Sequence, residues 1–510
     1  HLFGNPGTTE LAIMEAVPQF PELRYVMGLQ ESIVLAMADG YARASGRLVA
    51  CNLHCMPGLG HAMGALYSAK FSGSPVIVTA GQYEIGHGLT EPLLYAPLVP
   101  VATPLVKWAV EVERIADLPR IVRRAARIAL TPPTGPVFIS LPGNVLDEEA
   151  ELDLGHRTRV STDTRPSEAV IAALAERLLQ AERPVILAGK ELAERDAFAE
   201  AAELARRLGA PVWLETVAYN ARFPVEHPLA MGEITRSQPR VRATLEAHDL
   251  LICLGADLLR MSPWHPVEPL PEGLPVIHLS ERVDELGKNY PTEIAIAANV
   301  RETLAALLPA LAARQTPAQV ARADRAAAAI ASDNWSARRE RRATAIAARE
   351  ASRPIDQDYL MWRLAEALRA DAIVVEETLT CSAALTAFLR TRERDGFYGL
   401  ASGGLGFGLP GAIGVALARP GRPVVAVLGD GSSLYSIQAL WTAPPLPLPI
   451  HFVIVNNRSY RIIKDRLVAM RGTDAFTGMD IRDPAIDFPA IAKGFGLPAS
   501  EVSDPARIDT

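Results

Sequence analysis

Two short polar segments of the chain could hold a metal ion and the phosphates of a ligand. Gly-Asp-Gly-Ser occupies residues 429–432 and Val-Asn-Asn occupies 455–457, and each follows an apolar run, over 423–428 and 450–455. These runs predict two parallel strands, and open α/β sheets bind their ligands at the carboxyl ends of such strands. Carboxylate and amide oxygens at that edge are ligands that a hard cation such as Mg²⁺ accepts. Together the two segments predict a site for a cation and a diphosphate.

The residues around Asp430 also suit a phosphate. Gly429 and Gly431 let the backbone approach a ligand closely. Ser432 can begin a helix that we predict over 436–442, whose amino terminus would carry partial positive charge toward an anion. Taken alone, Gly-Asp-Gly is usually a tight turn and Asn-Asn a loop. The occurrence of both, each after a strand, favours the binding site.

The elements that must position these residues alternate along the whole chain. Apolar strand-like runs alternate with helical periodicity, which predicts an α/β fold of parallel sheets with crossover helices. Because 510 residues are too many for one core, we expect three doubly wound domains, over 1–150, 167–312 and 350–510. A charged stretch at 147–166 is predicted to be a linker, and 314–353 a helical connector.

The predicted strands cover 47–53, 75–80, 136–140, 184–188, 211–214, 250–254, 275–279 and 372–375, and the predicted helices cover 31–44, 115–129 and 359–368.

Composition excludes several classes of protein. A net charge of −7 without a dense Lys/Arg run argues against nucleic acid as the main partner. No stretch reaches the roughly 18–20 apolar residues of a membrane span. The four cysteines form no CxxC pair, so we expect no disulfide framework and no cysteine-based zinc site. Because so few cysteines indicate a reducing compartment, we expect a cytoplasmic protein. The chain begins at His1 and not at Met, and we expect both of its ends to be truncated.

The pair of Gly-Asp-Gly at 429–431 and Asn-Asn at 456–457 resembles the diphosphate-binding motif of the thiamine-diphosphate enzymes. These enzymes consist of pyrimidine-binding, middle and diphosphate-binding α/β domains in this order. The resemblance covers nearly the whole chain and implies thiamine diphosphate and Mg²⁺ as cofactors. It implies that the side chains of Asp430 and Asn457 and the backbone carbonyl of Ser459 bind the metal. The other cofactor-binding residues that it implies are Glu377, Gly403, Leu405, Gly429, Gly431, Ser432, Tyr460 and Ile462.

The family also has a glutamate just before a helix of its first domain. Met-Gly-Leu-Gln-Glu-Ser at 27–32 precedes an apolar helical run at 33–44, and Glu31 stands in the matching place. The resemblance implies that Glu31 is catalytic and hydrogen-bonds a ring nitrogen of the cofactor's aminopyrimidine. Taken alone, a glutamate at a helix start is usually a capping residue or a partner of the helix dipole.

A histidine follows the strand predicted over 47–53. His54 would lie at its carboxyl end, in a segment that resembles the benzoylformate decarboxylase branch of the family, as do residues 3–7, 60–66, 105–108, 403–407 and 436–442. The branch implies that His54 is a catalytic acid or base and that Thr8 contacts the substrate. A single histidine is otherwise more often structural.

Two further roles follow from the resemblance. Leu405 would be the apolar wedge that bends the cofactor, and Glu377 would lie near the cofactor at the mouth of the third domain. The alternative for Leu405 is ordinary core packing, which the sequence does not distinguish.

The chain departs from that branch where the substrate would bind. Thr8 replaces a serine, and the position of a second active-site histidine carries Ser262, with His265 three residues further on. Gly399 and Arg466 occupy the places of two aromatic residues that hold an aryl ring, with Lys464 nearby. The substrate pocket is therefore expected to be roomier or more polar.

We expect a thiamine-diphosphate- and Mg²⁺-dependent, non-oxidative decarboxylase of a 2-oxo acid. The resemblance implies that the site lies between two subunits, so that a homodimer is the minimum unit and a homotetramer is expected. One alternative is a carboligase of the acetolactate synthase or 2-hydroxyacyl-CoA lyase type, with a flavin or nucleotide in the middle domain; residues 184–190 lack a full dinucleotide fingerprint. The other is a non-catalytic phosphate-binding protein on the same fold.

Overall fold

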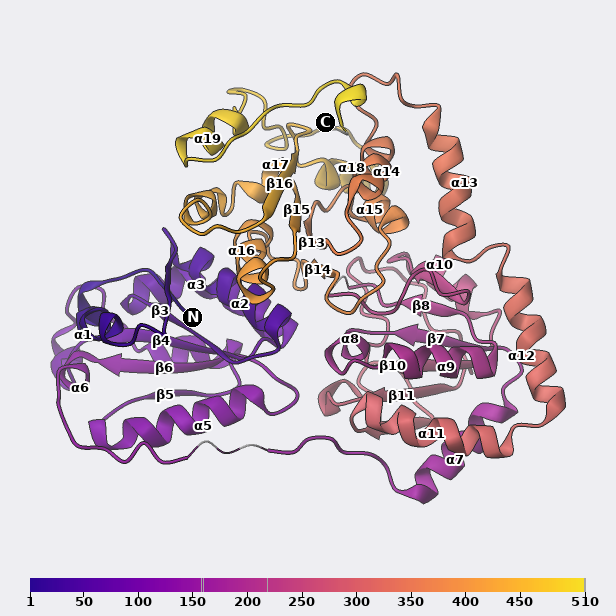
Figure 1. The fold of residues 1–510 in the computed structure, drawn as a ribbon, viewed down its shortest axis with the longest axis horizontal. Helices are drawn as coiled ribbons and strands as arrows, with labels where there is room; N and C mark the ends of the chain where they lie inside the picture. Colours follow the sequence, from indigo (N-terminus) through magenta and orange to yellow (C-terminus); the bar gives the residue numbers. More distant parts are fainter. Residues whose placement is uncertain (157, 159, 218, 509–510) are drawn as a thin grey trace. The chain divides into compact units, whose positions relative to one another are not determined.

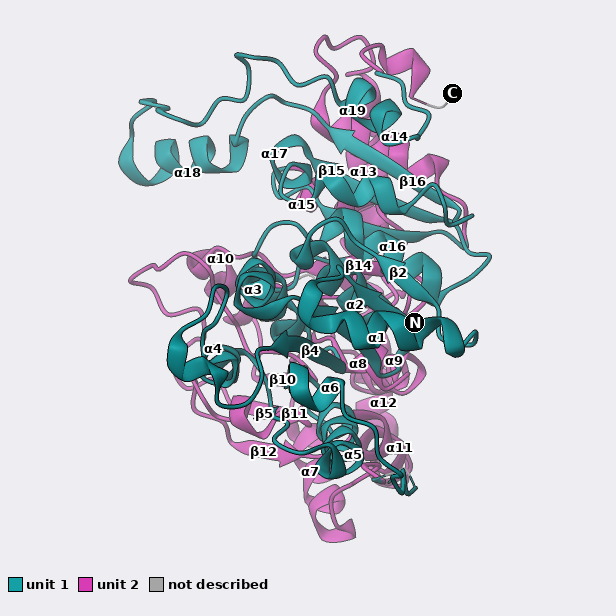
Figure 2. Cartoon of the chain, turned by 90° about the vertical axis from the view of Figure 1, so that its left-hand side faces the viewer, with its two compact units in different colours: residues 1–160, 371–380, 399–501 teal, residues 161–370, 381–398, 502–510 magenta. Residues whose placement is uncertain are grey.

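The computed structural model describes residues 1–156, 158, 160–217 and 219–508. Residues 157 and 159 of the predicted linker, and residues 509–510 of the third predicted domain, lie outside the described residues. The chain groups into two compact units (Figure 2). Unit 1 comprises His1–Val160, Asp371–Thr380 and Gly399–Glu501, and unit 2 comprises Ser161–Ala370, Cys381–Tyr398 and Val502–Thr510.

Three parallel sheets with crossover helices form the fold, which confirms the predicted α/β class (Figure 1). The first two sheets each have six strands, in the orders β2-β1-β3-β4-β6-β5 and β12-β11-β10-β7-β8-β9, and the third has the order β13-β15-β16 within unit 1. Strand β6, which lies between β4 and β5, is buried along its whole length, as expected for a strand covered on both faces. Within the described residues, no helix combines the length and the apolarity that crossing a membrane requires.

The strands are β1 (Leu2–Gly4), β2 (Tyr25–Met27), β3 (Val49–Leu53), β4 (Val76–Gln82), β5 (Ala109–Glu111), β6 (Val137–Pro142), β7 (Pro184–Ala188), β8 (Val212–Leu214), β9 (Ala230–Glu233), β10 (Leu250–Leu254), β11 (Val276–Ser280), β12 (Ile294–Ala297), β13 (Ile373–Glu377), β14 (Phe397–Gly399), β15 (Val424–Gly429) and β16 (Ile450–Val455).

The α-helices of unit 1 are α1 (Leu11–Ala16), α2 (Glu31–Ser45), α3 (Cys55–Ser72), α4 (Leu98–Ala102), α5 (Leu118–Leu130), α6 (Gly143–Leu146), α16 (Gly408–Ala418), α17 (Asp430–Ser433), α18 (Arg461–Arg471) and α19 (Phe488–Gly494). Those of unit 2 are α7 (Glu168–Gln180), α8 (Glu191–Glu194), α9 (Phe198–Leu208), α10 (Gln238–Leu245), α11 (Val300–Arg314), α12 (Pro317–Ile330), α13 (Trp335–Ala347), α14 (Gln357–Ala367) and α15 (Ser382–Phe388).

Strands β15 and β16 are neighbours and run parallel, with Gly429 opposite Val455. The two polar segments therefore start at the same edge of the sheet, as predicted. The helix predicted over 436–442 is present at Ile437–Thr442, as a 3₁₀-helix, and a further helical turn, α17, comes directly after β15. Pro444 and Pro445 follow this segment, and proline excludes the longer run of i→i+4 hydrogen bonds that an α-helix needs.

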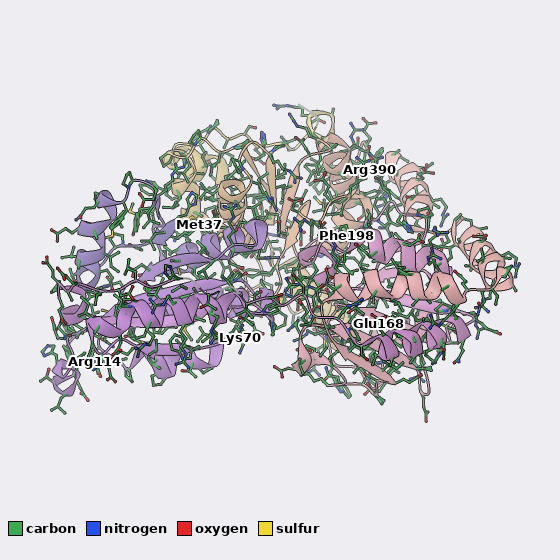
Figure 3. The ribbon with its side chains drawn as sticks, turned by 60° about the horizontal axis from the view of Figure 1, so that its bottom comes forward. Met37, Lys70, Arg114, Glu168, Phe198 and Arg390 are labelled. Carbon is green, nitrogen blue, oxygen red and sulfur yellow. The ribbon has the colours of Figure 1, made fainter. Side chains whose placement is uncertain are left out.

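Helices α2 and α16 cross in backbone contact inside unit 1. A Cβ on Gly40 would lie 2.3 Å from the carbonyl oxygen of Gly411, and one on Gly414 would lie 2.0 Å from that of Met37. Met37 is buried on α2, whereas Arg114 of the same unit is exposed, and both are labelled in Figure 3. Because α2 begins at Glu31 and α16 begins just after Leu405, this crossing places two of the candidate site segments.

Candidate active site

Asp430 is a buried carboxylate at the edge where β15 and β16 end. Its oxygens accept hydrogen bonds from the backbone N–H of Gly431 at 2.8 Å and of Ser459 at 3.2 Å. Burial raises the pKa of Asp430, against the backbone N–H groups, which lower it. Among the described residues, no Lys or Arg is ion-paired with this carboxylate. A buried acid that lacks a cationic partner fits a divalent cation.

The loop after β16 is held beside Asp430 by a short antiparallel pairing. Ser459 forms a β-bridge with Asp480, and the Tyr460 N–H donates to the Met479 carbonyl at 3.0 Å. A Cβ on Gly431 would lie 2.7 Å from the Tyr460 ring, so this approach requires glycine. Asn457 stays exposed at the same edge. Its amide and the Asp430 carboxylate are thus the side-chain oxygens that could hold Mg²⁺.

The remaining predicted cofactor residues of this edge surround the same loops. Gly429 ends β15, Ser432 is buried in α17, and Ile462 is half-buried in the first turn of α18.

Glu377, the last residue of β13, fixes the loop that carries Leu405. Its carboxylate oxygens accept hydrogen bonds from the backbone N–H of Gly406, at 2.6 Å, and of Gly408. Gly403 and Gly406 take φ values of +81° and +104°, which favour glycine. Burial raises the pKa of Glu377 to about 8. Leu405 itself is half-buried and not part of the core, so its side chain is available to a ligand.

Glu31 is the first residue of α2, but it does not cap the helix. The Gln30 side chain is the cap, accepting hydrogen bonds from the N–H of Ser32 and of Ile33. The Glu31 carboxylate instead lies 3.0 Å from Nδ1 of His61 on α3, and 12% of its side chain is exposed. Glu31 is thus positioned by one helix and contacted by another, with its carboxylate within reach of a ligand.

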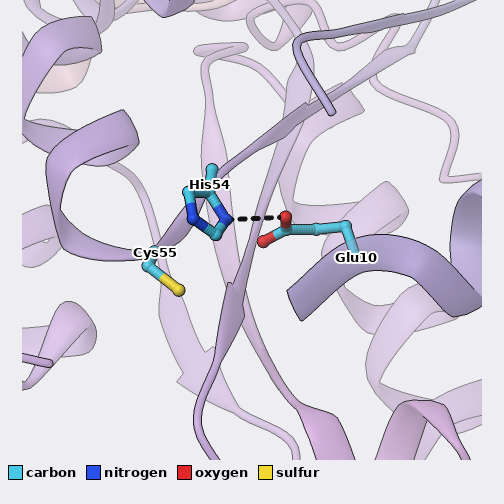
Figure 4. A group of neighbouring side chains, drawn as sticks. All are labelled: Glu10, His54 and Cys55. Carbon is cyan, nitrogen blue, oxygen red and sulfur yellow. Dashed lines mark hydrogen bonds and ion pairs between the residues drawn. The ribbon is translucent and has the colours of Figure 1, made fainter. Parts of the chain in front are cut away.

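His54 lies directly after β3, as predicted, and belongs to a cluster with Glu10, Thr9 and Cys55 (Figure 4). Nδ1 of His54 is 2.9 Å from a carboxylate oxygen of Glu10, which is fully buried. Oε1 of Glu10 accepts hydrogen bonds from Thr9 Oγ1 at 2.6 Å and from the Gly81 N–H at 2.8 Å. A carboxylate held in this way assigns the proton to Nδ1 of His54 and leaves Nε2 to exchange a proton with a substrate.

Sequence patterns did not find Glu10, Thr9 or His61. Their partners lie 44, 45 and 30 residues away in the chain, a distance that no local spacing rule covers. Thr8, the predicted substrate contact, is exposed, and its neighbour Thr9 is the threonine that lies 3.2 Å from His54 Nδ1. The role of Thr8 stays a prediction.

The positions that depart from the benzoylformate decarboxylase branch have different surroundings. Lys464 is buried, bonded to Asp480 at 2.7 Å and packed on the Phe476 ring, whereas Arg466 is exposed on α18. Gly399 is buried at the end of β14. Ser262 and His265 are exposed in unit 2, where the His265 ring accepts a hydrogen bond from the Val267 N–H at 3.0 Å.

The switch point of the second sheet is closely packed. The strand order reverses between β7 and β10, and such switch points bind ligands in open α/β sheets. A Cβ on Gly189, just after β7, would lie 2.2 Å from Cα of Ala256, just after β10. Asp257 is buried beside them and paired with Arg260 and Arg282. A flavin or nucleotide in this domain, as the carboligase alternative requires, stays a prediction.

Comparisons with known proteins agree with this geometry. The chain matches the N-terminal TPP binding domain of thiamine pyrophosphate enzymes over residues 1–92, the central domain over 171–307 and the C-terminal TPP binding domain over 379–510. It is 33% identical to a benzoylformate decarboxylase of Pseudomonas aeruginosa over 503 residues, which cover 98% of this chain and 90% of that protein.

Two solved structures share the whole fold. A thiamine diphosphate-dependent 4-hydroxybenzoylformate decarboxylase of Rhodococcus jostii RHA1 superposes with a TM-score of 0.87 at 31% identity. A benzoylformate decarboxylase from Polynucleobacter necessarius superposes with a TM-score of 0.88 at 28% identity. Each match covers 100% of this chain and 92% of the other.

Proposed function

Because this chain belongs to the thiamine pyrophosphate enzyme family, we propose that it is a thiamine-diphosphate- and Mg²⁺-dependent, non-oxidative decarboxylase of a 2-oxo acid. The reaction resembles the one named for its benzoylformate decarboxylase relatives. When bound, thiamine diphosphate supplies the electron sink that accepts the electron pair left by departing carbon dioxide.

The pairing of His54 with Glu10 carries the proposal. Decarboxylation without oxidation requires that the carbon which loses carbon dioxide gains a proton. His54 sits at the carboxyl end of β3 with its Nδ1 held by the buried Glu10. Its Nε2 is therefore the group that delivers or removes a proton at the substrate. The ring is 21% exposed, which leaves this nitrogen open to a ligand.

The chain's own groups would hold the cofactor. Asp430 and Asn457, with the Ser459 carbonyl, would bind Mg²⁺, and Leu405 would support the bent cofactor from a loop that Glu377 fixes. Glu31 would hydrogen-bond the aminopyrimidine. The exposed side chain of His61 contacts the Glu31 carboxylate and would help to hold its orientation.

We propose that two copies of the chain complete each site, with Glu31 from one and Asp430 from the other. Helix α3 supports this pairing. It meets Glu31 near Gly58, where a Cβ would lie 3.2 Å from the carboxylate, but it meets the Leu405 loop near Gly64 and Ser68. These contacts are about 9–15 Å apart along the helix, so one chain holds Glu31 and the Leu405 loop apart.

The substrate pocket would differ from that of the aryl-specific relatives. The family resemblance places Gly399 and Arg466 where two aromatic residues would stand. Because Lys464 is already paired with Asp480, Arg466 is the cation that remains to meet an acidic or polar substrate at this position. We therefore propose 2-oxo acids with a polar or acidic side chain as the first candidates.

The test is release of carbon dioxide from a panel of aryl, branched and acidic 2-oxo acids, with thiamine diphosphate and Mg²⁺ at saturation. We expect at least one acid to be decarboxylated. Glu31→Gln should lower kcat by about 100-fold or more while the protein still binds thiamine diphosphate. Release by none of the acids, or near-normal turnover in Glu31→Gln, contradicts the proposal.

A further inference from the structure

Three side chains of different chemistry converge beside β3. The ligand atoms of Glu10, His54 and Cys55 all lie within 4.8 Å of one another (Figure 4). Glu10 and Cys55 are buried, and the partly exposed His54 ring leaves an approach from outside. The reaction proposed above uses His54 and its partner Glu10 but leaves the thiol without a role.

The carboxylate, imidazole and thiol form a ligand set suited to a thiophilic divalent cation. Zn²⁺ accepts S, N and O ligands at about 2.0–2.3 Å, and three protein ligands leave a fourth position open. Mg²⁺, in contrast, prefers oxygen ligands in an octahedron and would stay at Asp430. The expectation of no cysteine-based zinc site rested on the lack of a CxxC pair, and no such pair marks this set, because its members come from the 3₁₀-helix η1 (Thr8–Glu10), the residue after β3 and the start of α3.

Groups around the three ligands already fix their orientation. Thr9 Oγ1 donates to Glu10 at 2.6 Å and lies 3.2 Å from both His54 Nδ1 and Cys55 Sγ. The Gly81 N–H holds the carboxylate oxygen that faces away from His54. Such outer contacts orient metal ligands and tune their affinity.

We propose that Glu10, His54 and Cys55 form a binding site for Zn²⁺ or another thiophilic divalent cation, and that its occupancy inhibits the enzyme reversibly. Binding forms a sulfur–metal bond and releases the thiol proton to solvent; no oxidant or reductant is involved. A cation on Nδ1 of His54 shifts the Nδ1 proton to Nε2 and replaces the hydrogen bond to Glu10, whereas a cation on Nε2 occupies the nitrogen that faces the substrate; either binding mode prevents the proton transfer. The inhibition rests on the proposed function, whereas the binding does not.

Binding is measured on the full chain without thiamine diphosphate, in excess Mg²⁺, by titration with Co²⁺. We expect one equivalent to give a thiolate-to-cobalt charge-transfer band and the visible spectrum of a four-coordinate site, and Zn²⁺ to displace it. Co²⁺ at Asp430 would give no thiolate band. Cys55→Ser should abolish the band and weaken Zn²⁺ binding by about 10-fold or more. Cys381→Ser, a buried cysteine of unit 2, is the control that should retain both.

Absence of the band from the unmodified protein, or its persistence in Cys55→Ser, overturns the proposal. Cys55→Ala is the second variant should the serine protein not fold, and the same outcomes apply to it.

Inhibition is tested by adding Zn²⁺ to the enzyme loaded with thiamine diphosphate and Mg²⁺, each protein being compared with its own rate without Zn²⁺. We expect the Zn²⁺ concentration that half-inhibits Cys55→Ser to be at least about 10-fold higher than the concentration that half-inhibits the unmodified enzyme. Equal sensitivity overturns the regulatory role, and a protein that binds cobalt but releases no carbon dioxide contradicts the proposed function alone.

Discussion

The carboxylate of Glu10 decides what His54 can do, although it lies too deep to meet a substrate. It is fully buried and held by Thr9 and Gly81, so it cannot turn away from the imidazole. A histidine whose Nδ1 proton is bound in this way presents one tautomer and one ring orientation. Glu10 is therefore a positioning residue for the proton transfer.

Removing the charge of Glu10 should impair turnover without loosening the cofactor. An amide at this position can donate as well as accept, so Glu10→Gln no longer selects the Nδ1–H tautomer of His54. We expect kcat to fall by about 10-fold or more, while the affinity for thiamine diphosphate is unchanged. The affinity is measured by the quenching of the protein's tryptophan fluorescence as the cofactor is added. Glu15→Gln, on the exposed face of α1, is the control. Wild-type kcat in Glu10→Gln would refute the positioning role.

Glu377 makes the stability of unit 1 depend on pH. Burial raises its pKa to about 8 from a usual value of 4.5. At a pH below the pKa that Glu377 has in the unfolded chain, its carboxyl is protonated in both the folded and the unfolded state. Folding then does not require the burial of a charged carboxylate. As pH rises toward 8 the unfolded chain ionises first, so the free energy of unfolding falls by up to about 1.4 kcal/mol per pH unit.

Glu377→Gln tests this dependence. The variant cannot ionise and does not lose this stability. Its free energy of unfolding, minus that of the unmodified protein, should therefore increase between about pH 5 and about pH 8. Urea unfolding of the cofactor-free proteins measures the difference. Glu191 and Glu215, whose pKa values burial raises to about 7 and about 8, contribute equally to both proteins and cancel. A difference that does not change with pH would show that Glu377 is already ionised in the fold.

At the scale of elements, apolar runs located the strands well. The strands predicted over 184–188, 250–254 and 450–455 have these bounds in the structure, and the helix predicted over 31–44 extends by one residue. Buried parallel strands are continuous apolar runs, so their signal is strong. Short edge strands such as β9 and β12 were not identified, because half of each faces outward and its composition resembles a loop.

Contacts between distant segments account for what the sequence could not reveal at the site. Local patterns placed Asp430 and Asn457 after two neighbouring strands, whereas the family resemblance singled out Glu31 and His54; the roles of all four stay predictions. The clamp of Glu377 on Gly406 joins residues 29 positions apart, and no local pattern distinguishes a clamp from a ligand contact. Its position was therefore predictable, but its partners were not.

The crossing of α2 and α16 should tolerate no side chain. Gly40→Ala places a Cβ 2.3 Å from the Gly411 carbonyl oxygen, so the helices must separate. We expect the free energy of unfolding, measured in urea, to fall by about 1–3 kcal/mol. Gly64→Ala on α3 is the matched control: its Cβ would meet nothing within 4 Å, and it should stabilise the helix by up to about 1 kcal/mol. Equal stability of the two variants would refute the tight crossing.

At the scale of the whole molecule, the proposed site requires two chains. Each chain would contribute Glu31 to one site and Asp430 to the other, as closed twofold assemblies allow. Two inactive variants should then restore activity when they share a dimer, because one of the two sites receives both intact residues.

Chains carrying Glu31→Gln and Asp430→Ala, differently tagged and produced together, test this arrangement. The heterodimer purified through both tags should show about half of the wild-type kcat per dimer, whereas the separate homodimers, or their mixture, should show almost none. An inactive heterodimer would place Glu31 and Asp430 of the same chain in one site.

The bare crossing of α2 and α16 has a mechanical consequence. With glycines at the contact, no flexible side chain can absorb a shift, so we expect a displacement of one helix to displace the other. Glu31 begins one helix and the Leu405 loop leads into the other. In the proposed dimer these two ends serve different sites, and cofactor docking at one end would therefore transmit displacement through each protomer to the opposite site.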